Sequence, residues 1–357
     1  MSLRFRHLQA LAMASALALS ACSDTGPNFE GNFDAAATSA SVQTIDAAYS
    51  TPAFQSFAAL GGQFVVGGGV PAASARLIQA AAQSVTMTDQ AKIAADQIAN
   101  AIAAPAAILI PEEYRKQTYT YNGEAYVVNP DRADEAPDTG VRFILYAVNP
   151  VTGEITDGLE EIGYVDLIDL SNDTQASVQL VVASGGVTYL DYTVTATGVI
   201  TAPTFTIDGY ITDGDNQVDF TLVAGYVSTF ASVTLTIDYD ISVGDFSVSA
   251  DLELVTDGEE GASVTVDVTF THLGHTVRVF GGVENDMGTL QVTANGQLFA
   301  TITFTDTQIT VVGADGEALD QDEINALREL TEMIEDVFDA FEHLFHPVEF
   351  LFSGPQS

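Results

Sequence analysis

Two pairs of histidines have the residue type and the spacing that zinc binding requires. His272 and His275 flank a Leu-Gly turn, and His343 and His346 lie at the end of a helical pattern. Four imidazole nitrogens would make a tetrahedral zinc site if the two pairs met in space. No pattern in the sequence brings them together, so we interpret the first pair as turn residues and the second as cations favoured at a helix C-terminus. We assign no metal and no cofactor to them.

Carboxylates with regular spacing suggest a second kind of cation site. Asp213, Asp215 and Asp219 follow a predicted strand with the spacing of the early ligands in an EF-hand calcium loop. The pattern then fails, because glycine is missing at the sixth position and Ala224 stands where the final glutamate is needed. We interpret this segment as an acidic hairpin tip that could bind divalent cations weakly.

The sequence contains none of the common signatures of covalent or nucleotide chemistry. Gly-x-Ser-x-Gly and Gly-x-x-x-x-Gly-Lys do not occur, and no Gly-x-Gly-x-x-Gly follows a predicted strand. Carboxylates are too numerous for sequence alone to single out an acid and base pair, which needs convergent geometry. We therefore predict that the protein is not an enzyme.

The single cysteine, Cys22, ends a signal-peptide pattern. A basic start and an apolar run at 8–19, too short to span a membrane, precede it. Residues 19–22, Leu-Ser-Ala-Cys, resemble the lipobox of bacterial lipoproteins. The resemblance implies cleavage after Ala21, a diacylglycerol thioether on Cys22, and acylation of the new N-terminus with a fatty acid such as palmitate. Because Ser23 rather than aspartate follows the cysteine, it also implies delivery to the outer membrane.

The charge of the chain is strongly negative. It has 49 acidic and 10 basic residues, a formal net charge of −39, and between 143 and the C-terminus its basic residues are Arg278 and Arg328. Such a surface repels nucleic acid and anionic lipid headgroups. We predict no nucleic-acid partner, and we expect the lipid on Cys22 to be the attachment to the membrane.

Composition divides the chain into four segments. We predict a signal peptide at 1–21, a flexible tether at 22–41, an Ala-rich helical segment at 42–111 and a β domain at 112–357. In the helical segment we expect one helix from Pro71 and one capped by Thr88, with a loop at Gly61-Gly62.

Between Thr118 and Val312 apolar and polar residues alternate with a period of two. In 233–241, for example, Val, Leu, Ile and Tyr alternate with Thr and Asp, which is typical of a strand with one buried and one solvated face. Turn pairs such as Leu273-Gly274 and Asn295-Gly296 interrupt the pattern at short intervals. The sequence predicts an antiparallel up-and-down meander of roughly 12 to 15 strands, which could curve into a half-barrel.

The C-terminal segment returns to a helical period. Asp320 and Glu323 are in capping-box register, and an apolar stripe follows to about 346. We expect this long amphipathic helix, together with the Ala-rich helices, to pack on the apolar face of the sheet. The predicted fold class is therefore α+β.

Two hypotheses on function follow. Residues 121–153 look like a segment found in uncharacterised bacterial lipoproteins, which implies no activity. At the level of architecture the chain is similar to periplasmic carriers of lipids and lipoproteins, whose sheet and helices enclose an apolar cavity. The first hypothesis is a non-catalytic, lipid-anchored envelope protein, facing the periplasm or the cell surface, that acts as a structural or interaction module with another envelope protein. The alternative is a carrier of an apolar ligand such as a lipid, with Phe338, Phe341 and Phe345 lining the cavity.

Overall fold

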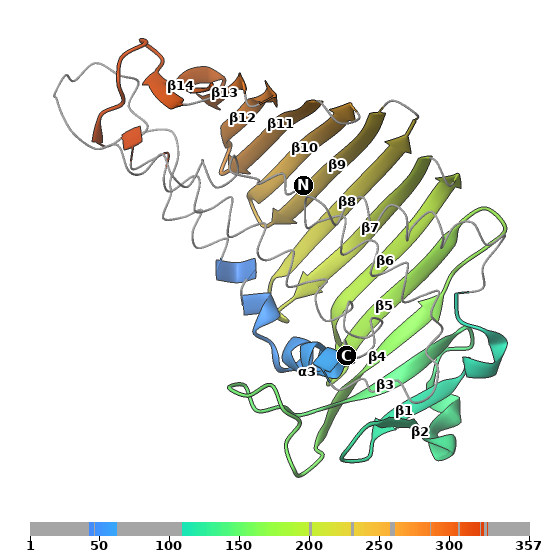
Figure 1. Cartoon of the computed structure of the whole chain (residues 1–357). Coiled ribbons are helices and arrows are strands. Elements are labelled where there is room, and N and C mark those ends of the chain that lie inside the picture. Colours follow the sequence, from blue (N-terminus) through green and yellow to red (C-terminus); the bar gives the residue numbers. More distant parts are fainter. Residues whose placement is uncertain are drawn as a thin grey trace. The chain divides into compact units, whose positions relative to one another are not determined.

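The computed structural model (Figure 1) describes part of the 357-residue chain. The described residues fall into two compact units, one that includes Thr44–Tyr226 and one that includes Val227–Asp339. We call them the first unit and the second unit. The described ranges are 43–45, 47–62, 109–199, 202–229, 232–257, 261–285, 287–305, 308–321, 323, 324 and 327.

About half of the described residues of the first unit lie in strands. Their order in the sheet is β8-β7-β6-β5-β4-β3-β1-β2. The strands are β1 (Gln117–Tyr121), β2 (Tyr126–Val128), β3 (Gly140–Tyr146), β4 (Glu161–Asp169), β5 (Ala176–Ser184), β6 (Val187–Val199), β7 (Ala202–Thr212) and β8 (Gln217–Ser228).

One pair of strands in the first unit departs from the predicted antiparallel meander. β1 pairs with β2 antiparallel but with β3 parallel, with Gln117 opposite Val141. The connection that allows this runs through β2 and the 3-10 helix η4 (Pro130–Glu135), which returns the chain to the start of β1. Parallel neighbours need such a crossover, whereas a hairpin joins antiparallel ones. The sheet is therefore mixed, and the prediction of a purely antiparallel sheet was wrong.

The second unit is an uninterrupted series of hairpins in its described part. Each strand pairs antiparallel with the next along the chain. The strands are β9 (Ser232–Val243), β10 (Phe246–Asp257), β11 (Gly261–His272), β12 (His275–Glu284), β13 (Met287–Ala294), β14 (Gln297–Phe304) and β15 (Ile309–Gly313).

The predicted alternation and the predicted turns are confirmed in these hairpins. Along β9 the side chains of Leu235, Ile237 and Tyr239 are buried, and Asp238 and Asp240 between and after them are exposed. The turns Leu273-Gly274 and Asn295-Gly296 have positive φ at both residues, as a type I′ turn requires.

Helices are few among the described residues, so the predicted α+β class was wrong and the described fold is essentially all-β. The strands are long, with 13 residues in β6 and 12 in each of β8 to β11, and they occupy most of the described chain. The helices expected from Pro71 and Thr88 lie outside the described residues. In the described part of 42–111, residues 43–45 and 47–49 are helical, and they precede α3 (Pro52–Gly62).

The helix α3 lies within the segment 42–111 that was predicted to be helical, but no individual helix was predicted at its residues. Its start is capped by Thr51, whose Oγ1 accepts the N–H of Phe54 at 3.3 Å. Pro52 occupies the first turn, where a missing N–H costs nothing. Gly61 and Gly62, expected in a loop, form the last residues of this helix.

The helix α3 covers part of the apolar face of the first unit. Its side chains of Phe57 and Leu60 are completely buried, and it contacts β3, β4, β5 and β6. Figure 1 shows α3 lying against the sheet near the ends of these strands. The hydroxyl of Ser56 donates to the carbonyl of Tyr146 at 2.7 Å, which fixes the helix to the end of β3.

The capping box predicted for the C-terminal segment is present. Oδ1 of Asp320 accepts the N–H of Glu323, and Oε2 of Glu323 accepts the N–H of Asp320, each at 2.9 Å. The described residues contain no long C-terminal helix beyond this start, since 328–357 lie outside them. Helical geometry is described at 321, 323, 324 and 327.

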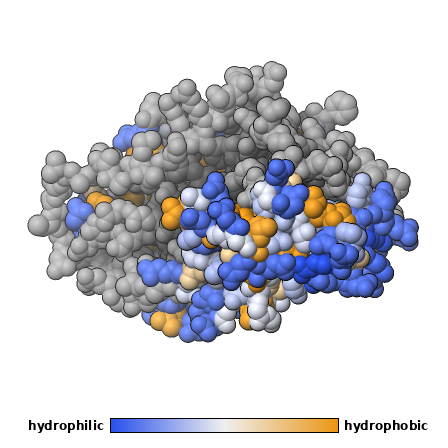
Figure 2. Space-filling view, turned by 90° about the horizontal axis from the view of Figure 1, so that it is seen from below, coloured by the Kyte–Doolittle hydropathy of each residue, from blue (hydrophilic) through white to orange (hydrophobic). Residues whose placement is uncertain are grey.

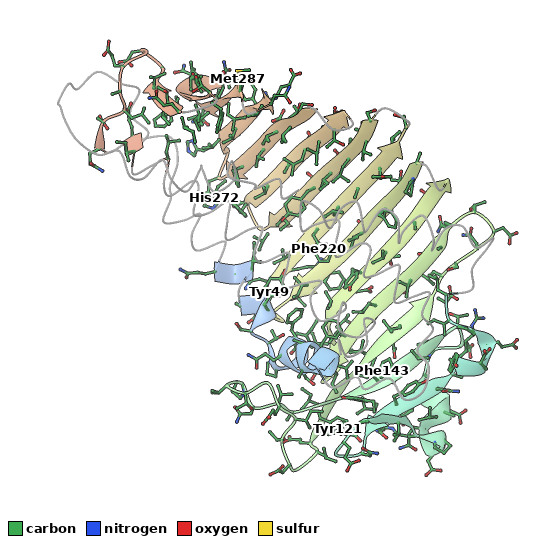
Figure 3. All side chains as sticks on the ribbon, viewed as in Figure 1. Tyr49, Tyr121, Phe143, Phe220, His272 and Met287 are labelled. Atoms are coloured by element: carbon green, nitrogen blue, oxygen red, sulfur yellow. The ribbon has the colours of Figure 1, made fainter. Side chains whose placement is uncertain are left out.

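Five aromatic side chains form a cluster where β1, β2 and β3 meet. The rings of Tyr119 and Phe143 stack at 4.8 Å between centroids, and Tyr126 lies within 6.4 Å of Phe143, Tyr121 and Tyr146. Tyr121 and Phe143 are labelled at this edge in Figure 3. Burial raises the pKa of Tyr119, Tyr126 and Tyr146, so these phenols remain protonated at physiological pH.

Candidate functional site

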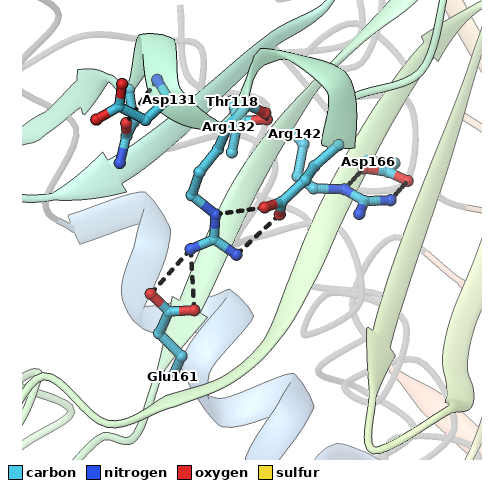
Figure 4. A network of polar contacts seen from close by, with 8 residues as sticks. Thr118, Asp131, Arg132, Arg142, Glu161 and Asp166 are labelled. Carbon is cyan, nitrogen blue, oxygen red and sulfur yellow. Dashed lines mark hydrogen bonds and ion pairs between the residues drawn. The ribbon is translucent and has the colours of Figure 1, made fainter.

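Basic residues are scarce in this chain, and every one in its described part is used in an ion pair. Four of the five lie close together in sequence, between 115 and 142. The pairs are Arg115–Asp169 at 3.2 Å, Lys116–Asp138 at 2.8 Å, Arg132–Glu135 and Arg132–Glu161 at 2.8 Å, Arg142–Asp166 at 2.7 Å, and Arg278–Asp267. The densest group of charges is the set Arg132, Glu135, Arg142, Glu161 and Asp166, which we call the arginine cluster (Figure 4).

The short helix η4 positions Arg132 in this cluster. Oδ1 of Asn129 caps the helix by accepting the N–H of Asp131 at 3.1 Å, and Thr118 of β1 donates to the carbonyl of Arg132 at 2.7 Å. The guanidinium donates two bonds to Glu135, at 2.9 and 2.8 Å, and two to Glu161, at 2.8 and 2.9 Å. The hydrogen bonds from Arg132 lower the pKa of Glu135.

Strand register positions the second arginine of the cluster. Arg142 on β3 lies directly opposite Asp166 on β4 and donates two bonds to its carboxylate, each 2.7 Å long. The guanidinium carbon also lies 3.5 Å from the ring centroid of Tyr164, in cation–π geometry. Burial raises the pKa of Asp166 above its usual value, and the bonds from Arg142 offset part of that rise. The pair is therefore partly desolvated and geometrically well matched.

A buried carboxylate beside the cluster holds the chain that enters the first strand. One oxygen of Asp169, Oδ2, accepts the N–H of Ile110 at 3.1 Å and a guanidinium N–H of Arg115 at 3.2 Å. The other accepts the N–H of Ser171 at 3.0 Å. Arg115 closes the ring by donating from Nε to the carbonyl of Ile110 at 2.9 Å. We call this arrangement the Asp169 clamp.

These ion pairs determine whether the described arginines and lysine are available to bind a ligand. A cation that recognises an anionic substrate must be free to approach it, but each described arginine and lysine already has a carboxylate partner. The arginine cluster therefore acts as a scaffold that joins η4, β3 and β4. What the first unit presents to solvent beside it is negative charge, because Glu154, Asp157 and Glu160 are exposed just before β4.

Of the three aspartates with EF-hand-like spacing, Asp213 and Asp215 lie in the turn between β7 and β8, and Asp219 lies on β8. Oδ1 of Asp213 accepts the N–H groups of Asp215 and Asn216, at 2.8 and 2.7 Å, and these bonds lower the pKa of Asp213. Asp219 accepts a bond from Gln217 at 2.6 Å. Within the described ranges, no three His, Cys, Asp or Glu side chains are grouped as metal binding requires.

The first histidine pair lies at a hairpin, as its sequence position indicated. His272 and His275 are opposite each other in register, and the buried ring of His272 meets Phe246 edge to face at 6.2 Å. Nδ1 of His275 lies 3.4 Å from the side-chain nitrogen of Asn295. His343 and His346 lie outside the described residues, as do Cys22 and the three phenylalanines Phe338, Phe341 and Phe345.

Three aspartates form a row across the second unit. Asp251 on β10 lies opposite Asp238 on β9 and opposite Asp267 on β11. Partial burial and the neighbouring Asp251 raise the pKa of Asp238, whereas hydrogen bonds from Arg278 lower the pKa of Asp267. Like charges directly opposite each other destabilise a sheet, so this row opposes the pairing of its strands.

Sequence reasoning missed both the arginine cluster and the aspartate row. The aspartate row depends on the register of β9, β10 and β11. The arginine cluster brings together residues 24 and 29 positions apart, through the register of β3 with β4 and the placement of η4. The composition contained one signal. Acidic residues greatly outnumber basic ones in this chain, which indicates that each arginine between 115 and 142 forms an ion pair.

Comparison of the chain with protein-family models, with curated proteins and with solved structures gives no match. Among the helical residues that the structure describes, none belong to a helix with the length and apolar character needed to cross a membrane.

Proposed function

We propose that this protein is a lipid-anchored, non-catalytic protein of the bacterial cell envelope whose β-sheet serves as an interaction module. The observation that carries the proposal is that each described arginine and lysine is paired with a carboxylate, in a chain with 49 acidic and 10 basic residues. Because these cations are few and each already has a carboxylate partner, carboxylates dominate the charge of the chain.

The anchor in this proposal is the acylated Cys22. Several acyl chains on one residue exceed the two-signal requirement for stable membrane attachment, at roughly 0.8 kcal/mol for each buried methylene. The tether at 22–41 would then hold the acidic sheet away from anionic headgroups, which repel it. A partner would meet a rigid, negatively charged surface attached to the outer membrane.

The test of the anchor is the substitution Cys22→Ala. We expect the variant to lose its lipid and to move from the membrane fraction to the soluble fraction, or to accumulate with its signal peptide uncleaved. Ser23→Ala is the matched control, because it changes the neighbouring residue but keeps the cysteine, and it should remain in the membrane fraction. Recovery of a processed Cys22→Ala protein in the membrane fraction would contradict the proposal.

A further inference from the structure

The two strands at the ends of the sheet order differ in how well their outer edges are protected. β15 has β14 as its one neighbour in the sheet, and β2 has β1 as its one neighbour. The outer edge of such a strand carries backbone N–H and C=O groups onto which another strand can pair. Natural sheets prevent this pairing by keeping the edge strand short, by placing charged residues or proline on it, or by covering it.

The edge at β2 has several of these protections. The strand contains three residues, Tyr126–Val128, Glu124 lies just before it, and Pro130 follows it closely. Figure 2, seen from below, shows that hydrophilic residues dominate the described surface at this end of the first unit. We therefore expect β2 to pair poorly with a further strand.

The edge at β15 lacks the same protections in the described part of the chain. The strand, Ile309–Gly313, has the sequence Ile-Thr-Val-Val-Gly, whose first four residues are β-branched and favour strands. The sequence from Gln308 to Ala314 contains no charged residue and no proline, although the chain as a whole is strongly acidic. The next carboxylate, Asp315, lies in the turn that follows the strand.

Strand register shows which backbone groups of β15 point away from β14. The N–H of Thr305 donates to the carbonyl of Gln308 at 2.9 Å, so these two residues form a hydrogen-bonded pair at the start of the β14–β15 hairpin. Hydrogen-bonded and non-hydrogen-bonded pairs alternate along antiparallel strands, which assigns Ile309 and Val311 to the non-hydrogen-bonded positions. The N–H and C=O groups of these two residues therefore point outward.

The chain satisfies one outward group of β15 but not the others. Gly313 is the next residue in the same alternation, and its N–H donates to the carbonyl of Glu317 at 2.9 Å, away from β14. No hydrogen bond between described residues reaches the outward groups of Ile309 and Val311. The side chains of these two residues are half-buried, whereas the β14 residues opposite them are buried. A further strand would supply both the missing hydrogen bonds and the missing burial.

We propose that β15 pairs with β15 of a second copy of this chain, antiparallel and about a two-fold axis at Thr310. Ile309 then lies opposite Val311 of the second copy, and each such pair exchanges both of its N–H···O bonds. Two β-branched residues face each other on the apolar side and two threonines on the polar side, which are favourable cross-strand pairs.

The symmetry of this pairing is what favours a second copy over an unrelated strand. The same residues supply the donors and the acceptors on both sides, so every outward group of Ile309 and Val311 is satisfied. No carboxylate lies opposite another between 308 and 312, because this stretch contains none. A strand with acidic residues at these positions would not fit equally well, since the rest of each chain is already negative.

Charge and area predict that the pairing is weak in solution. Each copy has a formal net charge of −39, so the copies repel each other and added salt should favour the dimer. A short strand also buries less than the roughly 1,200 Å² typical of a stable interface. Anchoring at Cys22 would raise the effective concentration of the copies. The inference rests on the proposed function for this last step alone, and the pairing is tested without the anchor.

Disulfide trapping of the full chain tests the register. Cys22→Ala removes the single cysteine, and Thr310→Cys in that background places one thiol at the proposed two-fold axis. Residues opposed at a non-hydrogen-bonded position have Cα atoms about 4.5 Å apart, which a disulfide can bridge. Val312→Cys is the matched control on the same face of β15, because its counterpart in the second copy lies roughly 13 Å further along the strand.

We expect mild oxidation to give at least tenfold more disulfide-linked dimer with Thr310→Cys than with Val312→Cys, as measured on non-reducing gels. Equal amounts from the two variants would indicate random collision, and no dimer from Thr310→Cys would show that the edges do not meet. Either result would overturn the proposal. The Cys22→Ala fractionation reports on the anchor separately, so failure of one experiment does not imply failure of the other.

Sedimentation velocity at low and high salt measures the strength of the pairing. Val311→Pro removes one outward N–H and leaves the bonds to β14 in place, since proline is tolerated on an edge. Val128→Pro makes the matched change on β2, where the bond from the N–H of Asn129 to Thr118 shows by the same alternation that the N–H of Val128 points outward.

We expect Val311→Pro to weaken the Kd of the dimer at least tenfold and Val128→Pro to change it less than twofold. Equal weakening by both variants would indicate head-to-tail pairing of β15 with β2, and the two-fold dimer would be wrong. A wild-type chain that stays monomeric at every concentration and salt would also overturn the pairing.

Discussion

Two arginine–aspartate pairs, one in each unit, use the same geometry in different surroundings. Arg142–Asp166 joins β3 to β4, and Arg278–Asp267 joins β12 to β11, each through two hydrogen bonds. In both pairs the arginine also lies over an aromatic ring, at 3.5 Å from the ring centroid of Tyr164 and at 4.4 Å from that of Phe280. The side chains differ in exposure, with 18% and 9% for Arg142 and Asp166 but 46% and 32% for Arg278 and Asp267.

The difference in exposure reverses the effect on the carboxyl group. The pKa of Asp166 is raised, because loss of solvent outweighs the bonds from Arg142, whereas the pKa of Asp267 is lowered by the bonds from Arg278. The hydrogen-bond geometry of an ion pair therefore does not by itself show how much that pair stabilises the fold. Removing one partner of the buried pair is strongly destabilising, because it leaves a desolvated charge without a partner. In the exposed pair, water solvates the remaining charge, so the loss is small.

The largest effect should come from breaking the buried pair. We expect Arg142→Ala to lower the free energy of unfolding by about 3 kcal/mol, because the buried carboxylate of Asp166 loses its partner. Urea unfolding of the full chain, followed by far-ultraviolet circular dichroism, measures the change. The double variant Arg142→Met/Asp166→Leu is the control, and it should recover most of the loss because no unpaired charge remains. A loss below about 1 kcal/mol in the single variant would show that water reaches Asp166 freely.

The exposed pair should contribute much less. We expect Arg278→Ala to cost about 0.5 kcal/mol, within the usual range for surface ion pairs. The effect should shrink further in high salt, because the Debye length falls to about 3 Å at 1 M. The same unfolding experiment at low and high salt measures it. A loss as large as that of Arg142→Ala would mean that burial is not what separates the two pairs.

The smallest effect should be the pH dependence that Asp238 gives to the second unit. Its raised pKa means that the folded state keeps a proton at pH values where the unfolded state has lost it. The free energy of unfolding should therefore rise as the pH falls from neutral toward the ordinary pKa of aspartate, about 4. Below that range the contribution of Asp267, whose pKa is lowered, is lost as its carboxylate becomes protonated.

Thermal melts between neutral pH and the ordinary aspartate range test this dependence. Asp238→Asn should raise Tm at neutral pH and flatten the rise on acidification. Asp245→Asn serves as the control, because it removes one negative charge from the β9–β10 turn of the same unit. If both variants changed the pH profile equally, general charge repulsion rather than the opposed pair Asp238 and Asp251 would be responsible.

Local patterns allowed the strands and hairpins to be predicted, because both depend on residues near one another in sequence. The alternation along β9 and the type I′ turn at Asn295-Gly296 are of this kind, and so is the capping box of Asp320 and Glu323. The parallel pairing of β1 with β3 could not be read in the same way, since it depends on how the chain crosses after β2. The helix α3 lies within the predicted helical segment 42–111, but its position was not predicted, and the glycine pair at its end indicated a loop.

The candidate site was harder to predict than the fold. Arg142 and Asp166 meet only if β3 and β4 pair in one register, and a shift of one residue would place them on opposite faces.

The Asp169 clamp has a consequence for the order in which the chain folds. In the second unit each strand pairs with its immediate successor, so every closure spans a short turn and costs little chain entropy. The bond between Ile110 and Asp169 spans 59 residues and can form only after β3 and β4 are in place. Contacts of large sequence separation slow folding. We therefore expect the hairpins of the second unit to form early and the clamp to close late, as the step that commits the N-terminal part of the first unit to its sheet.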